Sequence, residues 1–358
     1  MKRSIRLADV AELAGVSLGT ASNAFNRPDL VRPEVRELVE KAARKLGYSG
    51  PDPKGRLLMG GKANAIGVLP PGDMTVTHAM RSPFFRDFLQ GVSEICDENN
   101  ANVLMVSGTE DRKVWSIRNA LVDGFILGHV EEVGLISVRN RKVPFVVMDM
   151  DAGPATRSVR IEARKGARLA AEHLLGLGHR QFAIVSVLRK PADPVWHPPN
   201  EPNRQLTAGY LLDQEKLLGY GDALETAGIP IGTVPVVEFH PATPFVEAGA
   251  RALFDSATAA TAFLVMSDVQ AIAILAEAKR RKIKVPRDIS VVGFDGVSTA
   301  AYTEPPLTTV AQPLFERGRV AARMLFDAGS PRHVCLPVEL IVRSSTAARP
   351  SKVTARRA

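Results

Sequence analysis

The chain has 358 residues, enough for two or three domains, and its 45% hydrophobic content is ordinary for a globular protein. Two distant cysteines and the lack of any apolar run near about 18 residues indicate neither a disulfide framework nor a membrane span, so we expect a cytoplasmic protein without a structural metal. The net charge of +8 is uneven, because residues 1–60 hold eleven Lys and Arg against seven Asp and Glu, and residues 349–358 hold four more cations. A basic head on a nearly neutral body favours phosphate contacts by the head.

Residues 7–46 predict three short helices, of which the first two meet at Gly15. Gly15 suits a turn with positive φ, Ser17 is a natural N-cap for a second helix that begins at Leu18, and Pro33 suits the first turn of the third helix. The spacing is that of a helix-turn-helix, although a small helical bundle without a special function would show it too. The positions expected to be buried are Val10, Leu13, Ala14, Val16, Ala21, Ala24, Phe25, Val35, Leu38, Val39, Ala42 and Leu46.

The start of the second helix carries Leu18, Gly19, Ser22 and Asn23, a face too small and polar for a core. Recognition helices present such N-terminal residues to base edges. Residues 15–19 also satisfy the G-x-S-x-G motif of hydrolases, but that motif requires a strand before the serine, and here a helix precedes it. An esterase is therefore disfavoured.

A segment rich in Gly and Pro follows Tyr48 and has the composition of a linker. Asp52 and Pro53 could start a helix of about two turns, which is too short to be stable alone in water. Residues 55–62 half resemble a phosphate-binding loop, but Lys62 comes one place late and the next residue lacks the hydroxyl that binds magnesium. Nucleotide hydrolysis is therefore set aside.

From residue 65 onward, short apolar runs alternate with helical stretches, as in parallel sheets covered by helices. No G-x-G-x-x-G follows a strand, and the seven His residues show no metal-ligand spacing, so we expect no cofactor and no metal. The strand-like runs are AIGVLP, NVLMVS, GFILG, FVVMD, FAIVSV, TAFLVM and ISVVGFD, and the helical stretches are residues 84–99, 163–177, 216–227, 244–254, 269–282 and 314–328.

Residues 7–48 resemble the N-terminal domain of the LacI/GalR family of bacterial repressors, whose pattern combines L-x-D-V-A, A-G-V-S, T-x-S and L-G-Y. The phrases SPFF, EHLLGLGHR, ISVVGFDG and PPLTTVAQP, at residues 82–85, 172–180, 289–296 and 305–313, are similar to the effector domain of the same family. The resemblance covers almost the whole chain. It implies an all-α helix-turn-helix head plus an α/β periplasmic-binding-protein-like effector domain with two doubly wound lobes.

The resemblance also implies the domain boundaries and a ligand between the lobes, where the carboxyl ends of parallel strands generally bind ligands. The implied segments are a head over residues 1–48, a hinge over 49–61, an effector-binding and dimerisation domain over 62–345 and a basic tail over 346–358. Within the effector domain, the first lobe would take residues 62–160 and 298–326, and the second would take 161–295 and 330–345.

The resemblance implies that the head contacts operator DNA, with a hinge helix that wedges a leucine into the minor groove. Counting back from Ile66 favours Leu58 as the wedge, whereas counting forward from Tyr48 favours Leu57; we choose Leu58. Asn23 could bond an adenine edge and Leu18 could touch a thymine methyl. The expected DNA-contacting residues are Leu7, Ser17, Leu18, Gly19, Thr20, Ser22, Asn23, Asn26, Leu30, Leu57 and Leu58.

Effector contacts can be carried over position by position. One of Phe84 and Phe85 would stack on a ligand ring, with core packing as the alternative. Asp149 and Asp295 end apolar strands, where a carboxylate needs a partner and could accept ligand hydroxyls or join the lobes. The remaining expected contacts are Lys216, which stands where most relatives have Arg, Ser267, which stands where many have Asn, its neighbour Asp268, and Trp196 in a long segment over residues 188–213 that could form a lid.

These features predict a ligand-controlled, DNA-binding transcriptional repressor that acts as a homodimer on the nucleoid, with a carbohydrate or a derivative as the effector. A solute-binding protein of sugar transport shares the two-lobed fold, but the helix-turn-helix disfavours it, as does the absence of a signal peptide. A sugar-processing enzyme is disfavoured because no nucleophile, base and orienting group survive together. Residues 344–358 carry no apolar heptads, so a coiled-coil tetramer is not expected.

Overall fold

The computed structural model describes residues 5–26, 28–50, 61–71, 74–107, 110–188, 190–200, 211–256 and 259–349. The chain divides into two compact units, Met1–Ala63 and Asn64–Ala358, each with its own core. Along the described residues, no helix is long and apolar enough to cross a membrane. The hinge leucines Leu57 and Leu58 and the end of the basic tail lie outside the described residues.

The first unit contains the helices α1 (Leu7–Ala14), α2 (Leu18–Asn26) and α3 (Pro33–Leu46), with a short 3₁₀ turn η1 (Pro28–Leu30) before α3. They pack around a small core in which Val10, Ala21 and Val39 are fully buried. The predicted helix-turn-helix is present. Two predicted core positions are wrong, because Leu13 is 44% exposed and Leu38 is 53% exposed. Helices this small bury a narrow stripe, which Ala11 and Ala43 fill in their place.

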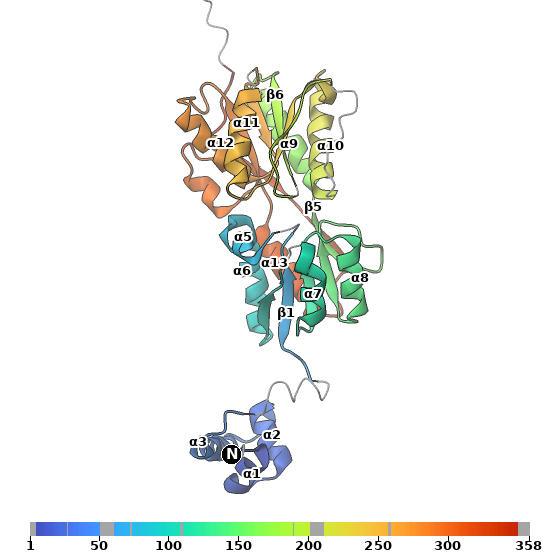
Figure 1. Cartoon of the computed structure of the whole chain (residues 1–358), viewed down its shortest axis with the longest axis vertical. Coiled ribbons are helices and arrows are strands. Elements are labelled where there is room, and N and C mark those ends of the chain that lie inside the picture. The colour runs from blue at the N-terminus through green and yellow to red at the C-terminus, as the bar shows by residue number, and fades with distance from the viewer. Residues whose placement is uncertain are drawn as a thin grey trace, which may run out of the picture. The chain divides into compact units, whose positions relative to one another are not determined.

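The second unit contains two sheets, each covered by helices and seen as two lobes in Figure 1. The first sheet has six strands in the order β12-β5-β4-β3-β1-β2, and all its pairings are parallel. Its strands are β1 (Ala65–Leu69), β2 (Asn102–Met105), β3 (Gly124–Leu127), β4 (Phe145–Met148), β5 (Arg157–Ile161) and β12 (His333–Leu336), and its helices are α5 (Val76–Arg81), α6 (Pro83–Glu98), α7 (Glu110–Asn119), α8 (Glu132–Asn140) and α13 (Leu314–Phe326).

The second sheet has seven strands in the order β13-β11-β10-β9-β6-β8-β7, parallel except for its two edge strands. Its strands are β6 (Phe182–Val187), β7 (Val195–His197), β8 (Val236–Phe239), β9 (Ala262–Val265), β10 (Ser290–Asp295), β11 (Thr308–Ala311) and β13 (Glu339–Ile341). Its helices are α9 (Ala163–Gly176), α10 (Leu211–Thr226), α11 (Phe245–Ser256) and α12 (Asp268–Arg280), with the 3₁₀ turns η2 (Ile231–Thr233) and η3 (Ser298–Tyr302).

The described chain passes between the two sheets three times, after β5, after β11 and between β12 and β13. The expected lobe boundaries differ from this path at two places. β11 joins the second sheet, although residues 298–326 were expected in the first lobe, and β12 joins the first sheet, although 330–345 were expected in the second. Apolar patterning marks a strand but does not say which of two sheets the strand pairs with, so the crossovers were misplaced.

The first lobe depends on a close contact between α6 and α13. A Cβ on Gly91 would lie 1.9 Å from the carbonyl oxygen of Phe315, and a Cβ on Gly318 would lie 2.1 Å from that of Phe88. The two backbones can therefore touch only because both helices carry glycine at the crossing point. This contact fixes the start of α6, with Phe84 and Phe85, relative to the first turns of α13.

Candidate functional site

The turn between α1 and α2 places the start of α2 at the surface. Gly15 ends α1 in the left-handed conformation with φ +68°, and the Ser17 hydroxyl oxygen accepts a hydrogen bond of 3.0 Å from the backbone N–H of Thr20. Ser17 is therefore the N-cap that the sequence predicted, and it satisfies one of the free N–H groups at the start of α2. The helix starts where its first residues are free to meet a partner.

Half of the expected DNA-contacting residues whose exposure the structure describes are exposed, and the other half are partly buried. Leu18 is 55% exposed and Leu30 is 67% exposed, which is unusual for leucine in a unit with so small a core. Ser17 and Gly19 are also exposed, while Thr20, Ser22 and Asn23 are half-buried. Leu7 differs, because it packs against the core of the head. The side chain of Asn26 lies outside the described residues.

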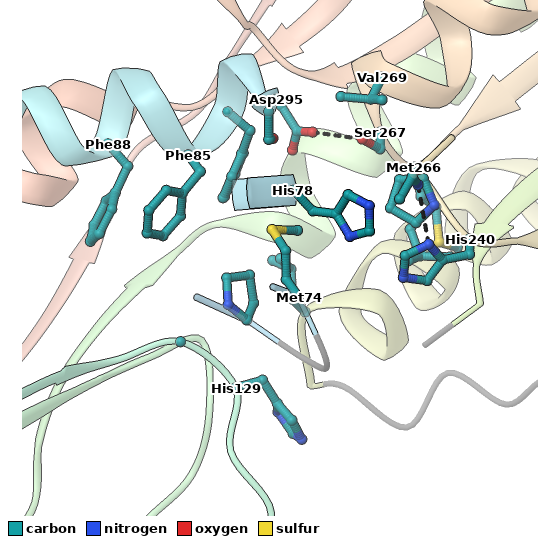
Figure 2. Close-up of a pocket in the computed structure, with 18 of the residues that line it drawn as sticks. Met74, His78, Phe85, Phe88, His129, His240, Met266, Ser267, Val269 and Asp295 are labelled. Atoms are coloured by element: carbon teal, nitrogen blue, oxygen red, sulfur yellow. Dashed lines mark hydrogen bonds between the residues drawn. The ribbon is translucent and has the colours of Figure 1, made fainter. Parts of the chain in front are cut away.

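The second unit contains a cavity of about 300 Å³ between its two lobes. Its wall follows the carboxyl ends of β1, β3 and β4 in the first sheet and of β6, β8, β9 and β10 in the second. This is the position predicted for the ligand. Figure 2 shows Phe85 and Phe88 on one side of the cavity and Met266 and His240 on the other, with His78 between them.

The cavity wall is largely apolar, and Phe84 and Phe85 contribute to it differently. Phe84 lines the cavity and packs against the cores of both lobes. Phe85 also lines the cavity but is only 2% exposed, because most of its ring belongs to the core of the first lobe. Of the two aromatic candidates, Phe84 therefore offers the more accessible ring.

A continuous set of polar contacts joins the two lobes across the floor of the cavity. Arg317 on α13 donates to the carboxylate of Asp149 and to the side-chain oxygen of Gln312. Gln312 in turn donates from Nε2 to Asp295 Oδ1 at 2.8 Å, and Ser267 donates to Asp295 Oδ2 at 3.1 Å. The predicted carboxylates of Asp149 and Asp295 both line the cavity, and each already accepts hydrogen bonds from protein side chains.

Asp149 and Asp295 both have positive φ, of +50° and +124°. Such backbone conformations persist only where the surroundings fix them, and they are common at binding sites. Burial raises the pKa of Asp295 above its ordinary value, while the nearby Lys216 ammonium opposes that rise. The floor of the cavity is therefore a strained and tightly bonded structure.

Lys216 is buried beside this network, with a side chain only 2% exposed. Its ammonium donates to the carbonyl oxygen of Met266 at 2.8 Å, lies 4.0 Å from Asp295 Oδ1 and sits 4.2 Å from the centre of the Phe294 ring. The Lys216 ammonium is thus close enough to pair with the buried Asp295 carboxylate. Lys216 also lines the cavity, so a ligand could still reach it.

Two of the expected effector residues are not among those that line the cavity. Asp268 is fully buried beneath the wall, where it accepts hydrogen bonds from the hydroxyl of Thr309 at 2.6 Å and from the N–H of Val297 at 2.9 Å. Trp196 lies on the edge strand β7 and packs against the core of the second lobe. Ser267, by contrast, lines the cavity as expected.

The structure adds cavity residues that the sequence reading missed. His240 directly follows β8 and His129 comes two residues after the end of β3, and both lie on the cavity wall, so polar residues at every strand end would have pointed to them as they did to Asp149 and Asp295. Arg317 gave no such signal, because a basic residue in a helical pattern is usually exposed. The described residues contain no cluster of three or more His, Cys, Asp or Glu side chains that could hold a metal.

Comparison with known proteins agrees with both units. Residues 6–50 match the bacterial regulatory proteins of the lacI family, and residues 171–346 match the periplasmic binding protein-like domain. An HTH-type transcriptional regulator of Mycolicibacterium smegmatis is 32% identical over 363 residues, which cover 98% of each chain.

Two solved structures share the fold along nearly the whole chain. One is the lac repressor dimer bound to operator and the anti-inducer ONPF, with a TM-score of 0.74 and 26% identity over 97% of this chain and 100% of that one. The other is the complex of the transcriptional regulator CelR with cellobiose, with a TM-score of 0.65 and 26% identity over 96% of this chain and 100% of that one.

A helix-turn-helix head joined to a two-lobed periplasmic-binding-protein-like domain defines a class of DNA-binding transcriptional regulators. The chain belongs to the LacI family of bacterial regulatory proteins, as its identity with the Mycolicibacterium regulator over almost its full length shows. It is accordingly a regulator and not an enzyme. Family membership also removes the transport-protein alternative that the two-lobed fold alone left open.

Proposed function

We propose that the protein is a homodimeric repressor that binds a specific operator and whose affinity for that operator is set by a small carbohydrate-like ligand between its lobes. The observation that carries the DNA-binding part is the exposed start of α2, where Leu18 stands in solvent beside the Ser17 cap. A helix presented in this way enters the major groove with its N-terminal residues at the base edges. The similarity to an operator-bound repressor dimer supports this assignment.

The cavity supports the ligand part of the proposal. The cavity wall carries a carboxylate from Asp295, a hydroxyl from Ser267 and an imidazole from His240. The ring of Phe84 belongs to the same wall. Pockets for small polar ligands generally combine a broad apolar wall with a few placed polar groups. The similarity to a cellobiose complex favours a carbohydrate over other small polar ligands. Because the ligand would touch both lobes, its binding can shift their arrangement.

Asn23→Ala is expected to relax base preference at one position of each operator half-site, by about 1–3 kcal/mol of discrimination. An amide can bond adenine at two atoms, whereas alanine bonds neither. Selection from randomised DNA by the wild-type chain should first return a two-fold symmetric site, and selection by the variant should then return the same site with one position per half degenerate. Glu37→Ala on the exposed surface of α3 is the matched control and should keep the full preference.

Two outcomes would contradict the DNA-binding proposal. If the wild-type chain selects no site, sequence-specific binding is rejected. If Asn23→Ala selects the wild-type sequence at every position, Asn23 does not read a base and only that residue assignment fails.

A ligand of the cavity is expected to raise the thermal stability of the full chain by about 2.7 kcal/mol when present at about 100 times its dissociation constant. The measurement is a melting screen with cellobiose, ribose, sugar phosphates and nucleosides. Asp295→Asn serves as the check on location, because it alters a cavity carboxylate. A compound that shifts the melting temperature of this variant as much as that of the wild type binds elsewhere and does not support the proposal.

A further inference from the structure

The lobes are joined by a second polar contact, which lies outside the cavity. Asp87 on α6 accepts two hydrogen bonds from Ser298, one of 3.1 Å from its backbone N–H and one of 3.2 Å from its hydroxyl. Ser298 is the first residue of η3, where the backbone N–H has no partner within the helix and a carboxylate is a preferred cap. The cap therefore comes from the first lobe, while the helix that it caps belongs to the second.

The segment that carries Ser298 cannot move independently of the second lobe. Val297 and Ala300 are buried in the core of that lobe, and the N–H of Val297 donates to Asp268 at 2.9 Å. Gly296 has φ +70°, and a Cβ there would lie 2.5 Å from the Cα of Ala311. A movement of this segment is therefore a movement of the whole second lobe.

Both partners of the contact are connected to the cavity within one turn of chain. Ser298 follows Asp295 by three residues, and Asp295 lies on the cavity floor. Asp87 follows Phe84 by three residues on the same face of α6, and Phe84 lines the cavity while packing on both lobes. A ligand that shifts Asp295 or Phe84 can therefore change the geometry of the Asp87–Ser298 contact.

The contact differs in kind from the network on the cavity floor. That network passes through Gln312 in a crossover segment, where the lobes stay covalently connected at any opening angle. Asp87 and Ser298 have no such short connection, since they lie 211 residues apart in the chain. Separating the lobes therefore breaks the Asp87–Ser298 contact.

We propose that Asp87 is a positioning residue that latches the two lobes through Ser298, and that the state of this latch sets the operator affinity of the protein. The second half of this statement rests on the proposed DNA-binding function. The first half concerns the effector domain alone and can be tested without DNA.

Three variants separate the latch from general effects on α6. Asp87→Ala removes the acceptor. Ser298→Pro removes both donors, and proline fits here because Ser298 is the first residue of η3 and Val297 before it is extended, with ψ 147°. The matched control is Glu94→Ala, which removes a carboxylate from the same helix whose ion pair with Arg319, at 3.0 Å, stays within the first lobe.

Hydrogen–deuterium exchange of the full chain is measured on peptides covering residues 296–303, and operator affinity is measured on the site that the wild type selects. Asp87→Ala should accelerate exchange of the Ser298 amide, whose acceptor it removes, about tenfold within these peptides. Asp87→Ala and Ser298→Pro should both shift operator affinity in the same direction by about fivefold, whereas Glu94→Ala should change it less than about twofold. Asp87→Asn, which keeps one acceptor oxygen, should lie between Asp87→Ala and the wild type.

If Asp87 and Ser298 act through one contact, the effects of the two variants on operator affinity should not add. The double variant Asp87→Ala, Ser298→Pro should then have the operator affinity of either single variant. Unchanged exchange in Asp87→Ala overturns the latch. Faster exchange with wild-type operator affinity overturns its regulatory role. If the wild type selects no operator at all, the proposed function fails and the regulatory role falls with it, while the exchange measurement still decides whether the latch exists.

Discussion

Arg317→Met is expected to lower the free energy of unfolding of the second unit by about 3–5 kcal/mol. The guanidinium is 2% exposed and donates to both Asp149 and Gln312. Methionine fills much of the same volume but leaves the Asp149 carboxylate, which is 14% exposed, without its cationic partner. Breaking a buried pair from one side costs more than the pair itself contributes, because the remaining charge stays desolvated.

Thermal melting of the full chain measures this effect, and the transition of the second unit should fall by roughly 6–15 °C. Arg319→Met is the matched control, since Arg319 lies two residues along the same helix but is 29% exposed and pairs at the surface with Glu94 and Glu316. Exposed pairs of this kind contribute about 0–1 kcal/mol. A transition of Arg317→Met that melts within the range of Arg319→Met would show that the Arg317 contacts do not stabilise the floor.

A second variant identifies the reason for the loss. Asp149→Asn in the Arg317→Met background removes the uncompensated charge and should recover part of the lost stability. If the double variant is no more stable than Arg317→Met alone, the cost comes from lost packing around Arg317 and not from the stranded carboxylate.

The architecture and part of the site could be predicted from the sequence because they depend on local rules. The alternation of apolar runs and helical stretches predicted the parallel sheets, and five of the six named helices begin and end within two residues of the expected positions. α10 is the exception, since it already runs from Leu211 and not from residue 216. Asp149 and Asp295 were found because a carboxylate at the end of a buried strand needs a partner.

The partners of those carboxylates could not be predicted, because they come from remote segments. Arg317 reaches Asp149 across 168 positions of the chain, and neither residue carries a local sign of the other. Gln312 lies in a crossover whose course depends on which sheet β11 and β12 join, and the sequence pattern did not contain that information. Local patterns therefore located the cavity, whereas only the fold shows which of its polar groups are already engaged.

The same limit explains Asp268, which the sequence placed on the ligand and the structure places beneath the cavity wall. Its carboxylate occupies space that only a glycine leaves open, since a Cβ on Gly293 would lie 2.2 Å from Asp268 Oδ1. Burial, with a further contribution from Asp295, raises the pKa of Asp268 to about 8, although Thr309 and the N–H of Val297 donate to it. A carboxyl group with so high a pKa makes the free energy of unfolding depend on pH.

The pKa of Asp268 is raised in the folded state relative to the ordinary value of 3.8, so folding takes up a proton between about pH 4 and pH 8. The contribution of Asp268 to stability is therefore fully present below about pH 4 and is lost as the pH rises toward about 8. The titration of one carboxyl group changes the free energy of unfolding by at most about 1.4 kcal/mol per pH unit within this window. Glu277, whose pKa is lowered to about 2 by Arg280, acts in the opposite sense only at acid pH. His173 and His179, whose pKa values burial lowers, act in the opposite sense below about pH 6.5, so the contribution of Asp268 is the difference between the wild type and a variant.

Asp268→Asn is expected to flatten this dependence, because the amide resembles the protonated carboxyl, can accept from Val297 with its oxygen and can donate to Thr309 with its nitrogen. Unfolding of the full chain by urea at several pH values between 5 and 8.5 measures the effect. The variant should match the wild type near pH 5 and exceed it increasingly toward pH 8, whereas Asp151→Asn, at a carboxylate 78% exposed, should follow the wild type throughout. Parallel curves for the wild type and Asp268→Asn would show that Asp268 remains ionised in the folded protein, held in that state by its hydrogen-bond donors and not neutralised by burial.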